Sequence, residues 1–322
     1  MLILTTVCAL LAWLFTTIRS FFESKLDRIA GRRLGDVFQN YDTIYFGGAS
    51  WACATYIGAL KAIYDYHSQL RFGRGGVLIG AADGDPPDMF QMLGISRIGG
   101  HSAGALIGAM VCLGLSPQQI EEQYMRMTRL GRTEGVWGGK MTTYQHDVLN
   151  ELLVDPTAYR RCNGRLQIGM TLLDPLWLDP NNSKQIIVEH WNSNDELRRC
   201  LMCSFNVPAY CVQDARWTSE GREYIAIDGG IGFDASVLPR RTLTIGLVDA
   251  YDLHFEVETC DLVYPSTDDA KHQHLTGIGY DRMTAFLKSE PFDPKPKMPL
   301  HCPMFVWYML HRLFSVPDVP DQ

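Results

Sequence analysis

Apolar runs and helical stripes alternate along the middle of the chain. Residues 42–46 (DTIYF) are β-branched and aromatic and end at Gly47-Gly48, which predicts a buried strand. Residues 54–66 then carry Ile57, Leu60 and Ile63 on one stripe at helical spacing, which predicts a helix. The alternation continues downstream without an internal repeat. Further strands are predicted at residues 95–98, 166–173, 185–189, 223–227 and 243–248, and helices at 103–113, from Ser116-Pro117 onward, and at 194–203.

This order of strands and helices predicts an α/β fold. The expected architecture is a three-layer α/β/α domain, with a mostly parallel central sheet covered by helices on both faces. Sites in such sheets gather at the carboxyl ends of the strands. Gly47-Gly48, Ser102 and Asp228 each follow a predicted strand. We therefore expect three remote segments to converge on one edge of the sheet.

The N-terminal segment differs from the rest of the chain. Residues 1–18 carry no charged side chain and are close to the shortest length that spans a bilayer, and basic residues follow within residues 19–33. By the positive-inside tendency, this pattern predicts an uncleaved membrane anchor that holds the downstream domain on the cytoplasmic side. A signal peptide and a docked core helix are the alternatives. Residues 1–40 are thus expected to be a hydrophobic anchor helix and a basic juxtamembrane segment.

The C-terminal segment, residues 291–322, begins with a proline-rich linker. Residues 304–314 (MFVWYMLHRLF) are aromatic but too short and too charged to span a membrane. They are expected either to lie in a membrane interface or to pack on the domain as a terminal helix. Residues 41–290 remain as one large domain, and residues 67–94 within it are interpreted as an insertion or lid.

Composition narrows the range of functions. The chain has 322 residues, of which 46% are hydrophobic and 20% charged, so it is globular rather than disordered. A net charge of −7 without a long basic block argues against nucleic acid as a main partner. Nine cysteines include the single pair Cys200 and Cys203 in a C-x-x-C motif. Because a zinc site of this kind needs a second pair, we expect free thiols in a reducing compartment and no metal.

The motif Gly100-His101-Ser102-Ala103-Gly104 has the form G-x-S-x-G. Between a strand and a helix this pattern holds a serine in a strained turn with its hydroxyl exposed, and the helix N-terminus favours a developing anion. A serine nucleophile needs a base. His101 is adjacent in sequence, where side chains diverge, and is expected to pack beside the turn.

Asp228 is the stronger candidate for the base. It ends a predicted strand, and Gly229-Gly230 allows a tight turn that leaves its carboxylate at the rim of the sheet. An ordinary turn aspartate is the alternative interpretation when this motif is taken alone.

Together these motifs resemble those of the patatin-like phospholipases. Residues 100–106 look like the family's nucleophile motif, and Asp228-Gly229-Gly230 looks like its D-G-G/A motif. Residues 204–211 (SFNVPAYC) are similar to the S/A-x-x-x-P segment before that aspartate. Residues 166–175 look like the central strand, and residues 279–287 like a closing helix. The resemblance covers roughly residues 42–288.

The resemblance implies a Ser-Asp dyad without histidine. Ser102 would attack an ester carbonyl, and Asp228 would accept its proton, return it to the leaving alcohol and then activate water. The implied substrates are membrane lipids, namely phospholipids, lysophospholipids or acylglycerols, and no metal or organic cofactor is implied.

One segment departs from the family's pattern. The family's glycine-rich oxyanion loop corresponds here to residues 48–53 (GASWAC), in which Gly48 is kept but Ser50 and Cys53 replace glycines. Side chains at these positions are expected to resist the required backbone conformation and to lower activity. The expected oxyanion hole consists of Gly48, Ala49, Ser50, Trp51 and Ala103, with Gly47 beside it.

Two other functions remain open at this point. The chain order also fits an α/β-hydrolase triad of Ser102, Asp228 and one of His254, His272 or His274, although no HGGG-type loop is present. Alternatively, the altered glycine loop is typical of a lipid-binding protein that kept the fold and lost the activity.

Overall fold

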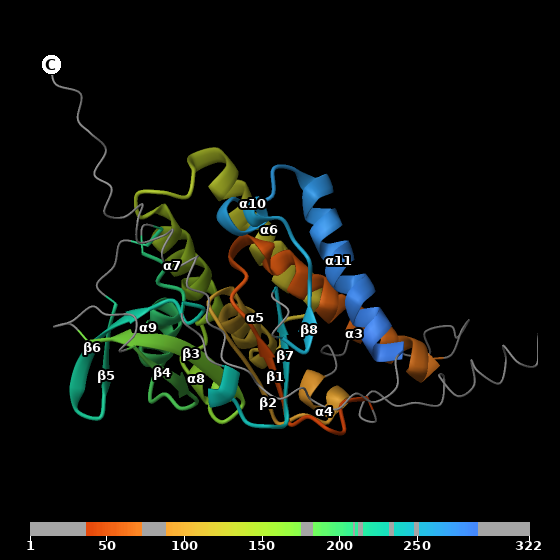
Figure 1. Cartoon of the computed structure of the whole chain (residues 1–322), viewed down its shortest axis with the longest axis horizontal. Coiled ribbons are helices and arrows are strands. Elements are labelled where there is room, and N and C mark those ends of the chain that lie inside the picture. The colour runs from red at the N-terminus through yellow and green to blue at the C-terminus, as the bar shows by residue number, and fades with distance from the viewer. Residues whose placement is uncertain are drawn as a thin grey trace, which may run out of the picture.

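The computed structural model describes residues 37–72, 88–174, 183–208, 210–211, 215–231, 235–247 and 251–288 (Figure 1). The predicted anchor, the C-terminal segment and the middle of the predicted insertion lie outside these residues. Among the helices within these ranges, none has the length and apolar character that a membrane span requires.

Eight strands form one mixed sheet within the described part of the chain. Their order is β5-β6-β3-β2-β1-β7-β8, and β4 also pairs with β3. Strands β1, β2, β3, β7 and β8 are parallel, so the sheet is mostly parallel, with helices on both sides, and the predicted α/β class is confirmed. The strands are β1 Thr43–Phe46, β2 Arg97–His101, β3 Leu166–Leu173, β4 Lys184–Val188, β5 Arg216–Ser219, β6 Arg222–Ile227, β7 Thr242–Gly246 and β8 Leu253–His254.

The predicted helices begin where expected, but α3 continues to Phe72, six residues beyond its predicted end at residue 66. Ser116 caps its helix through a capping box with Gln119, and the Ser193 hydroxyl accepts a hydrogen bond from the Glu196 N–H at the next N-terminus. The α-helices are α3 Ala54–Phe72, α4 Met89–Leu93, α5 Ala103–Cys112, α6 Pro117–Glu134, α7 Lys140–Leu152, α8 Ala158–Cys162, α9 Asn194–Ser204, α10 Thr259–Val263 and α11 Asp269–Lys288. Two short 3₁₀ helices are η1 Ser50–Cys53 and η3 Ala235–Val237.

The second strand lies later in the chain than predicted. Residues 95–98 were expected from their apolar character, whereas β2 continues through two glycines to His101. Those glycines pair with β1 and with β3, so hydrogen bonds from both neighbours extend the strand where propensity alone would end it.

Strands β2 and β6 meet end to end on one edge of β3. β2 pairs with residues 166–169 of β3 in parallel, and β6 pairs with residues 171–173 in antiparallel. β4 pairs with residues 168–172, which overlap both ranges, so β4 holds one edge and β2 and β6 share the other. Strands β2 and β6 therefore run toward each other along β3. The ends that meet are their last residues, His101 and Ile227. Ser102 and Asp228 are the residues that follow.

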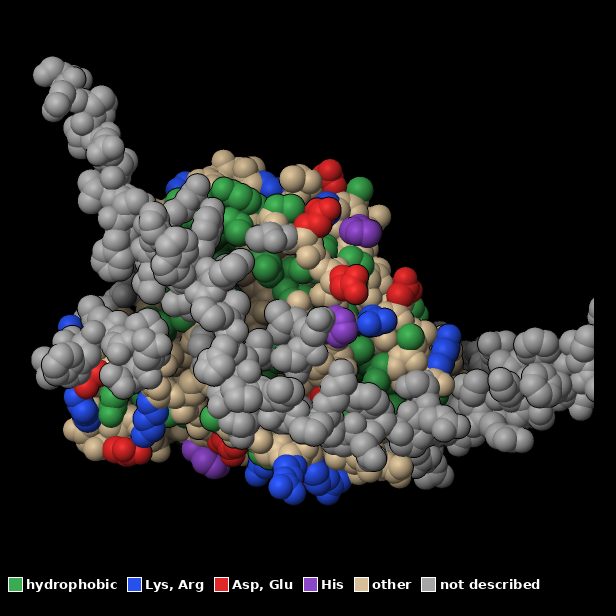
Figure 2. All heavy atoms as spheres, viewed as in Figure 1, with side chains coloured by type: hydrophobic (Ala, Val, Ile, Leu, Met, Phe, Trp, Pro, Cys, Tyr) green, Lys and Arg blue, Asp and Glu red, His purple; other side chains and the backbone are tan. Residues whose placement is uncertain are grey.

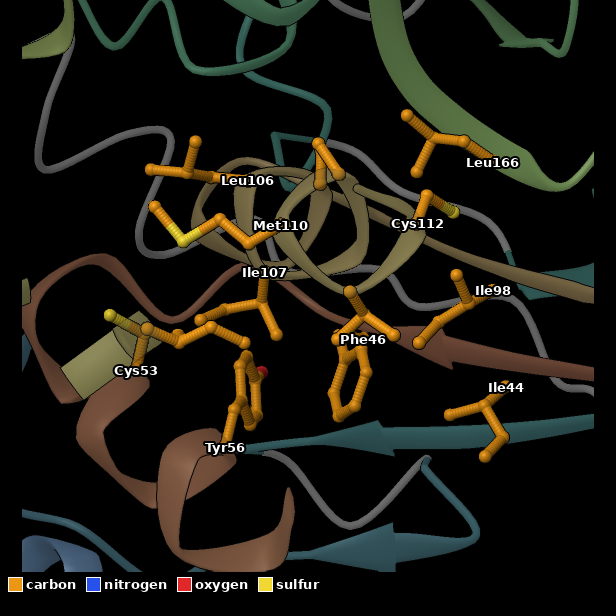
Figure 3. Packing of buried hydrophobic residues seen from close by; sticks show 14 of the residues in the cluster. Ile44, Phe46, Cys53, Tyr56, Ile98, Leu106, Ile107, Met110, Cys112 and Leu166 are labelled. Atoms are coloured by element: carbon orange, nitrogen blue, oxygen red, sulfur yellow. The ribbon is translucent and has the colours of Figure 1, made fainter. Parts of the chain in front are cut away.

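The core lies mainly on one face of the sheet. Ile44 and Phe46 alternate with Tyr45 along β1 and join the large buried cluster, in which the Phe46 ring lies near Tyr56 of α3 and Ile107 of α5 (Figure 3). Tyr45 points the other way, into a smaller cluster with Ala235, Leu238 and Ile187.

Helices α3 and α11 pack side by side along much of their length (Figure 1). The backbones approach so closely that a Cβ atom on Gly279 would lie 1.8 Å from the Thr55 carbonyl oxygen. A Cβ on Gly58 would lie 1.9 Å from the Thr276 carbonyl oxygen. Helix α11 is thereby fixed against α3.

Replacement of Gly279 by alanine should destabilise the fold by roughly 3 kcal/mol or more, because the added methyl group overlaps backbone atoms of α3. Gly277→Ala is the matched control on the same helix. Nothing lies within 4 Å of a Cβ atom at Gly277, so this substitution should raise the free energy of unfolding by about 0.5–1 kcal/mol through helix propensity alone. Urea denaturation measures both. Equal effects of the two substitutions would contradict this close packing of α3 and α11.

Candidate active site

Ser102 lies in the turn between β2 and α5 and has a strained backbone conformation. Its φ of 54° and ψ of −135° are uncommon for a residue with a side chain. Gly100 and Gly104 make the turn possible. A Cβ on Gly104 would lie 2.3 Å from the Phe46 carbonyl oxygen, and one on Gly100 would lie 2.4 Å from the Gly104 carbonyl carbon. The backbone geometry is that predicted for the G-x-S-x-G motif.

Asp228 is buried at the end of β6. Its Oδ1 atom accepts a hydrogen bond of 2.7 Å from the Gly230 N–H, and its Oδ2 atom has no hydrogen-bond partner among the residues that the structure describes. Burial raises the pKa of Asp228 to about 6, against smaller lowering effects from the Ser102 side chain and the Gly230 N–H. The carboxylate is therefore ionised at neutral pH, yet more basic than an exposed aspartate.

Ser102 and Asp228 lie close together. The Ser102 side chain is near enough to lower the pKa of Asp228, although it does not complete a hydrogen bond to Oδ2. The negative charge of Asp228 also contributes to the raised pKa of Tyr251 and of Tyr45, whose main cause is burial. Among the described residues, the Asp228 carboxylate thus lies near uncharged hydroxyl groups.

His101 packs beside the turn, as predicted. It is buried, its Nδ1 atom lies 3.4 Å from the Tyr45 hydroxyl oxygen, and the two rings are 5.7 Å apart. Burial lowers the pKa of His101 to about 3, so the imidazole is uncharged at neutral pH.

The histidines considered for a triad are placed differently. His272 lies on α11, where its Nε2 atom is 2.9 Å from Glu121 Oε1 and its ring stacks on Tyr124. His274 is exposed on the same helix, and His254 ends β8. The interactions described for His272 tie it to α6 rather than to Asp228.

Comparison with known proteins identifies the family. Residues 45–238 match the family model described as patatin-like phospholipase, which is more than half of the chain. The chain belongs to the patatin-like phospholipase family.

Two curated mouse proteins are similar to part of this patatin-like chain. Omega-hydroxyceramide transacylase is 30% identical over 142 residues, which are 42% of this chain and 21% of that protein. Patatin-like phospholipase domain-containing protein 2 is 30% identical over 148 residues, which are 44% of this chain and 28% of that protein. The matched region therefore spans less than a third of either relative.

Among solved structures, the heterodimeric ExoU–SpcU complex from the type III secretion system of Pseudomonas aeruginosa is similar to 77% of this chain and 51% of the matched chain. The identity is 15% and the TM-score is 0.39.

The glycine-poor loop of this patatin-like domain lies against the candidate nucleophile. A Cβ on Gly48 would lie 3.5 Å from the Ser102 Cβ atom, so the loop backbone borders the serine. Ser50 has a φ of 45°, in the left-handed region that favours glycine. Cys53 has no such conformation and lies buried at the end of η1. The loop therefore needs glycine's conformational freedom at position 50 and not at position 53.

Ser204 is a residue of the site that sequence reasoning missed. It ends α9, it is fully buried, and its hydroxyl oxygen accepts a hydrogen bond of 3.0 Å from the Ser102 N–H. The segment 204–211 was noted in the sequence for its family resemblance, which is the one signal that points to Ser204. Its hydrogen bonds depend on the packing of α9 against β3 and cannot be read from the pattern.

The cysteine and acidic clusters of the described region lie elsewhere. Cys200 and Cys203 are buried free thiols, and burial raises the pKa of Cys203 to about 12. Glu258, Cys260 and Asp261 bring potential metal-ligand atoms within 4.8 Å of one another. The Lys271 Nζ atom lies 2.9 Å from Glu258 and 3.0 Å from Asp261, so a cation of the protein already balances these carboxylates.

Ser50→Gly should raise the free energy of unfolding by about 0.5–1 kcal/mol, because glycine adopts positive φ without the strain that a Cβ atom causes. Glu220→Gly, at a φ of 54° in the turn between β5 and β6, relieves the same strain far from Ser102 and should give a smaller gain, because it also removes the exposed ion pair with Lys184. Ser50→Ala keeps the Cβ atom and should give none. Thermal or urea unfolding compares the three variants, and a gain for Ser50→Ala as large as that for Ser50→Gly would refute this interpretation of the loop.

Proposed function

We propose that this protein is a lipid acyl hydrolase that cleaves carboxylic esters of phospholipids or acylglycerols. The observation that carries the proposal is the strained Ser102 at the N-terminus of α5, next to a buried carboxylate with an unpaired oxygen. Membership of the patatin-like phospholipase family supports lipid hydrolysis in general. The dyad and the substrate class are our proposals.

The reaction begins with attack of the Ser102 oxygen on the ester carbonyl carbon. Asp228 accepts the proton of the Ser102 hydroxyl, and its pKa of about 6 suits a group that must be ionised and still basic. The protonated Asp228 then gives this proton to the alcohol oxygen as the carbon–oxygen bond of the ester breaks. An acyl group remains on Ser102.

The second half of the reaction releases the acid. Asp228 accepts a proton from a water molecule as the water oxygen attacks the acyl carbon, and the proton returns to the Ser102 oxygen when the acyl group leaves. The same carboxylate thus serves as base and then as acid in each half. The chemistry requires no group beyond the two side chains, water and an oxyanion hole.

The oxyanion hole in this proposal is built from backbone N–H groups. The Ser102 N–H donates to Ser204, so it is not available to the substrate. Ala103 is the first residue of α5, where N–H groups lack helical partners and the helix dipole favours negative charge. We assign the other donors to the loop of Gly48, Ala49, Ser50 and Trp51, which borders Ser102.

An apolar surface near this loop supports a lipid substrate. Hydrophobic side chains gather around α10 (Figure 2), and α10 packs against η1. Trp137 and Tyr264 are 42% and 51% exposed, and aromatic residues of this kind favour membrane interfaces. We propose that the domain works at a membrane surface, and the predicted anchor at residues 1–18 stays a prediction.

A series of esters and phospholipids of increasing acyl length tests the proposal. Ser102→Ala and Asp228→Asn should each lower kcat/KM by about 10³-fold or more, because one removes the nucleophile and the other its base. Release of free fatty acid from vesicles and of chromophore from soluble esters measures the rates. Wild-type hydrolysis no faster than that of the two variants on every substrate would refute the enzyme and leave a lipid-binding protein.

One control separates an effect on chemistry from an effect on folding, and a second one distinguishes the dyad from a triad. Because the pKa of Asp228 is higher in the folded than in the unfolded chain, its ionisation lowers stability as the pH rises through the interval between them. Asp228→Asn should therefore fold at least as stably as the wild type at neutral pH. Single alanine replacements of His254, His272 and His274 should retain hydrolysis, and collapse of activity with one of them would favour the triad.

A further inference from the structure

Ser204 connects the three segments that form the candidate site. Its hydroxyl oxygen accepts from the Ser102 N–H at 3.0 Å and donates to the Gly169 carbonyl oxygen at 2.7 Å. Its own carbonyl oxygen accepts a hydrogen bond of 3.0 Å from the Gly229 N–H. One buried residue therefore binds the nucleophile turn, the central strand β3 and the turn that carries Asp228.

These hydrogen bonds restrict the movement of the backbone segments that they join. The hydroxyl makes one donated and one accepted bond, both to backbone groups in a fully buried environment where an unpaired polar group is costly. Two residues along, the Asn206 carbonyl oxygen accepts from the Asp228 N–H at 2.9 Å, and its side chain donates to the Ala226 carbonyl oxygen at 2.8 Å. The segment after α9 thus fixes both strand ends from one side.

We propose that Ser204 is a positioning residue for the reaction. It holds the Ser102 backbone in its positive-φ conformation and sets the distance between the Ser102 hydroxyl and the Asp228 carboxylate. It also removes the Ser102 N–H from the oxyanion hole, which leaves oxyanion stabilisation to the Ala103 N–H and the loop at residues 48–51. This role rests on the proposed function, since it acts on the same two side chains.

The test compares Ser204→Ala, Ser204→Thr and the matched control Cys203→Ala. Cys203 is the preceding residue of α9 and is equally buried. Its carbonyl oxygen accepts a hydrogen bond from the Asn206 N–H, and this backbone bond is kept when the side chain is replaced by alanine. Ser204→Ala should lower kcat by about 10–100-fold with KM within about 2-fold, because the substrate surface is intact while the reacting groups are misplaced. Ser204→Thr keeps the hydroxyl and should retain kcat within about 5-fold, and Cys203→Ala should leave kcat unchanged.

Amide hydrogen exchange gives a readout that does not depend on activity. In Ser204→Ala the Ser102 N–H loses its acceptor, so its exchange should accelerate about 10-fold or more relative to wild type. The Gly229 N–H keeps its acceptor, the carbonyl oxygen of residue 204, and is the internal control.

The results separate this proposal from the proposed function. If wild type hydrolyses no ester, the proposed function fails, and faster exchange confined to the Ser102 N–H still supports the positioning of the turn by Ser204. Unchanged exchange at Ser102 overturns it. In an active enzyme, a Ser204→Ala kcat within about 2-fold of wild type, or an equal loss in Cys203→Ala, also overturns it.

Discussion

The shared edge of β3 is the constraint on which the site depends. β2 arrives in parallel and β6 in antiparallel, and neither has room to continue because the other occupies the next part of the same edge. Both strands must leave the sheet where they meet, and the residues at which they turn are Ser102 and Asp228. The approach is tight, since a Cβ on Gly229 would lie 2.5 Å from the Gly169 carbonyl oxygen and 2.6 Å from the His101 Cβ atom. The juxtaposition of a hydroxyl and a carboxylate follows from strand pairing.

The electrostatic character of the site follows from the same packing. The place where two strands end inside a sheet is buried, so Asp228 is kept from water and its pKa is raised. His101 is uncharged for the same reason and adds no positive charge beside the carboxylate. The Gly230 N–H and the Ser102 side chain are the interactions that favour its ionised form. A carboxylate held this way is a stronger base than one paired with a cation.

The fold class predicted from the sequence is confirmed, and the two candidate residues singled out in the sequence, Ser102 and Asp228, lie close together in the structure. Ser102 stands in a motif whose residues are all local, so its strained turn follows from neighbouring glycines. Asp228 was predicted to lie at the rim of the sheet, near Ser102, from its position after a strand in a mostly parallel sheet. The residue lies where expected, yet β6 is antiparallel to β3, because a strand's direction depends on a partner far away in sequence.

Other features could be predicted only in part. The left-handed conformation at Ser50 agrees with the glycine expected there by family resemblance, whereas Cys53 needs no such conformation. Ser204 illustrates the limit, because serine at a helix end has many possible partners and its bonds to Ser102 and Gly169 exist only in the folded packing. The residues of the local motifs could be identified from the sequence, whereas the hydrogen bonds between remote segments could not.

The pairing of Ser102 with Asp228 is the central claim, and titration of the Asp228 carboxyl carbon by ¹³C NMR in wild type and Ser102→Ala tests it most directly. The Asp228→Asn spectrum identifies the signal. We expect a pKa of about 6 in the wild type, and a higher pKa in Ser102→Ala because the hydroxyl that favours the ionised form is gone. A wild-type pKa of about 4, as in an exposed aspartate, or an identical pKa in the two proteins would contradict the account.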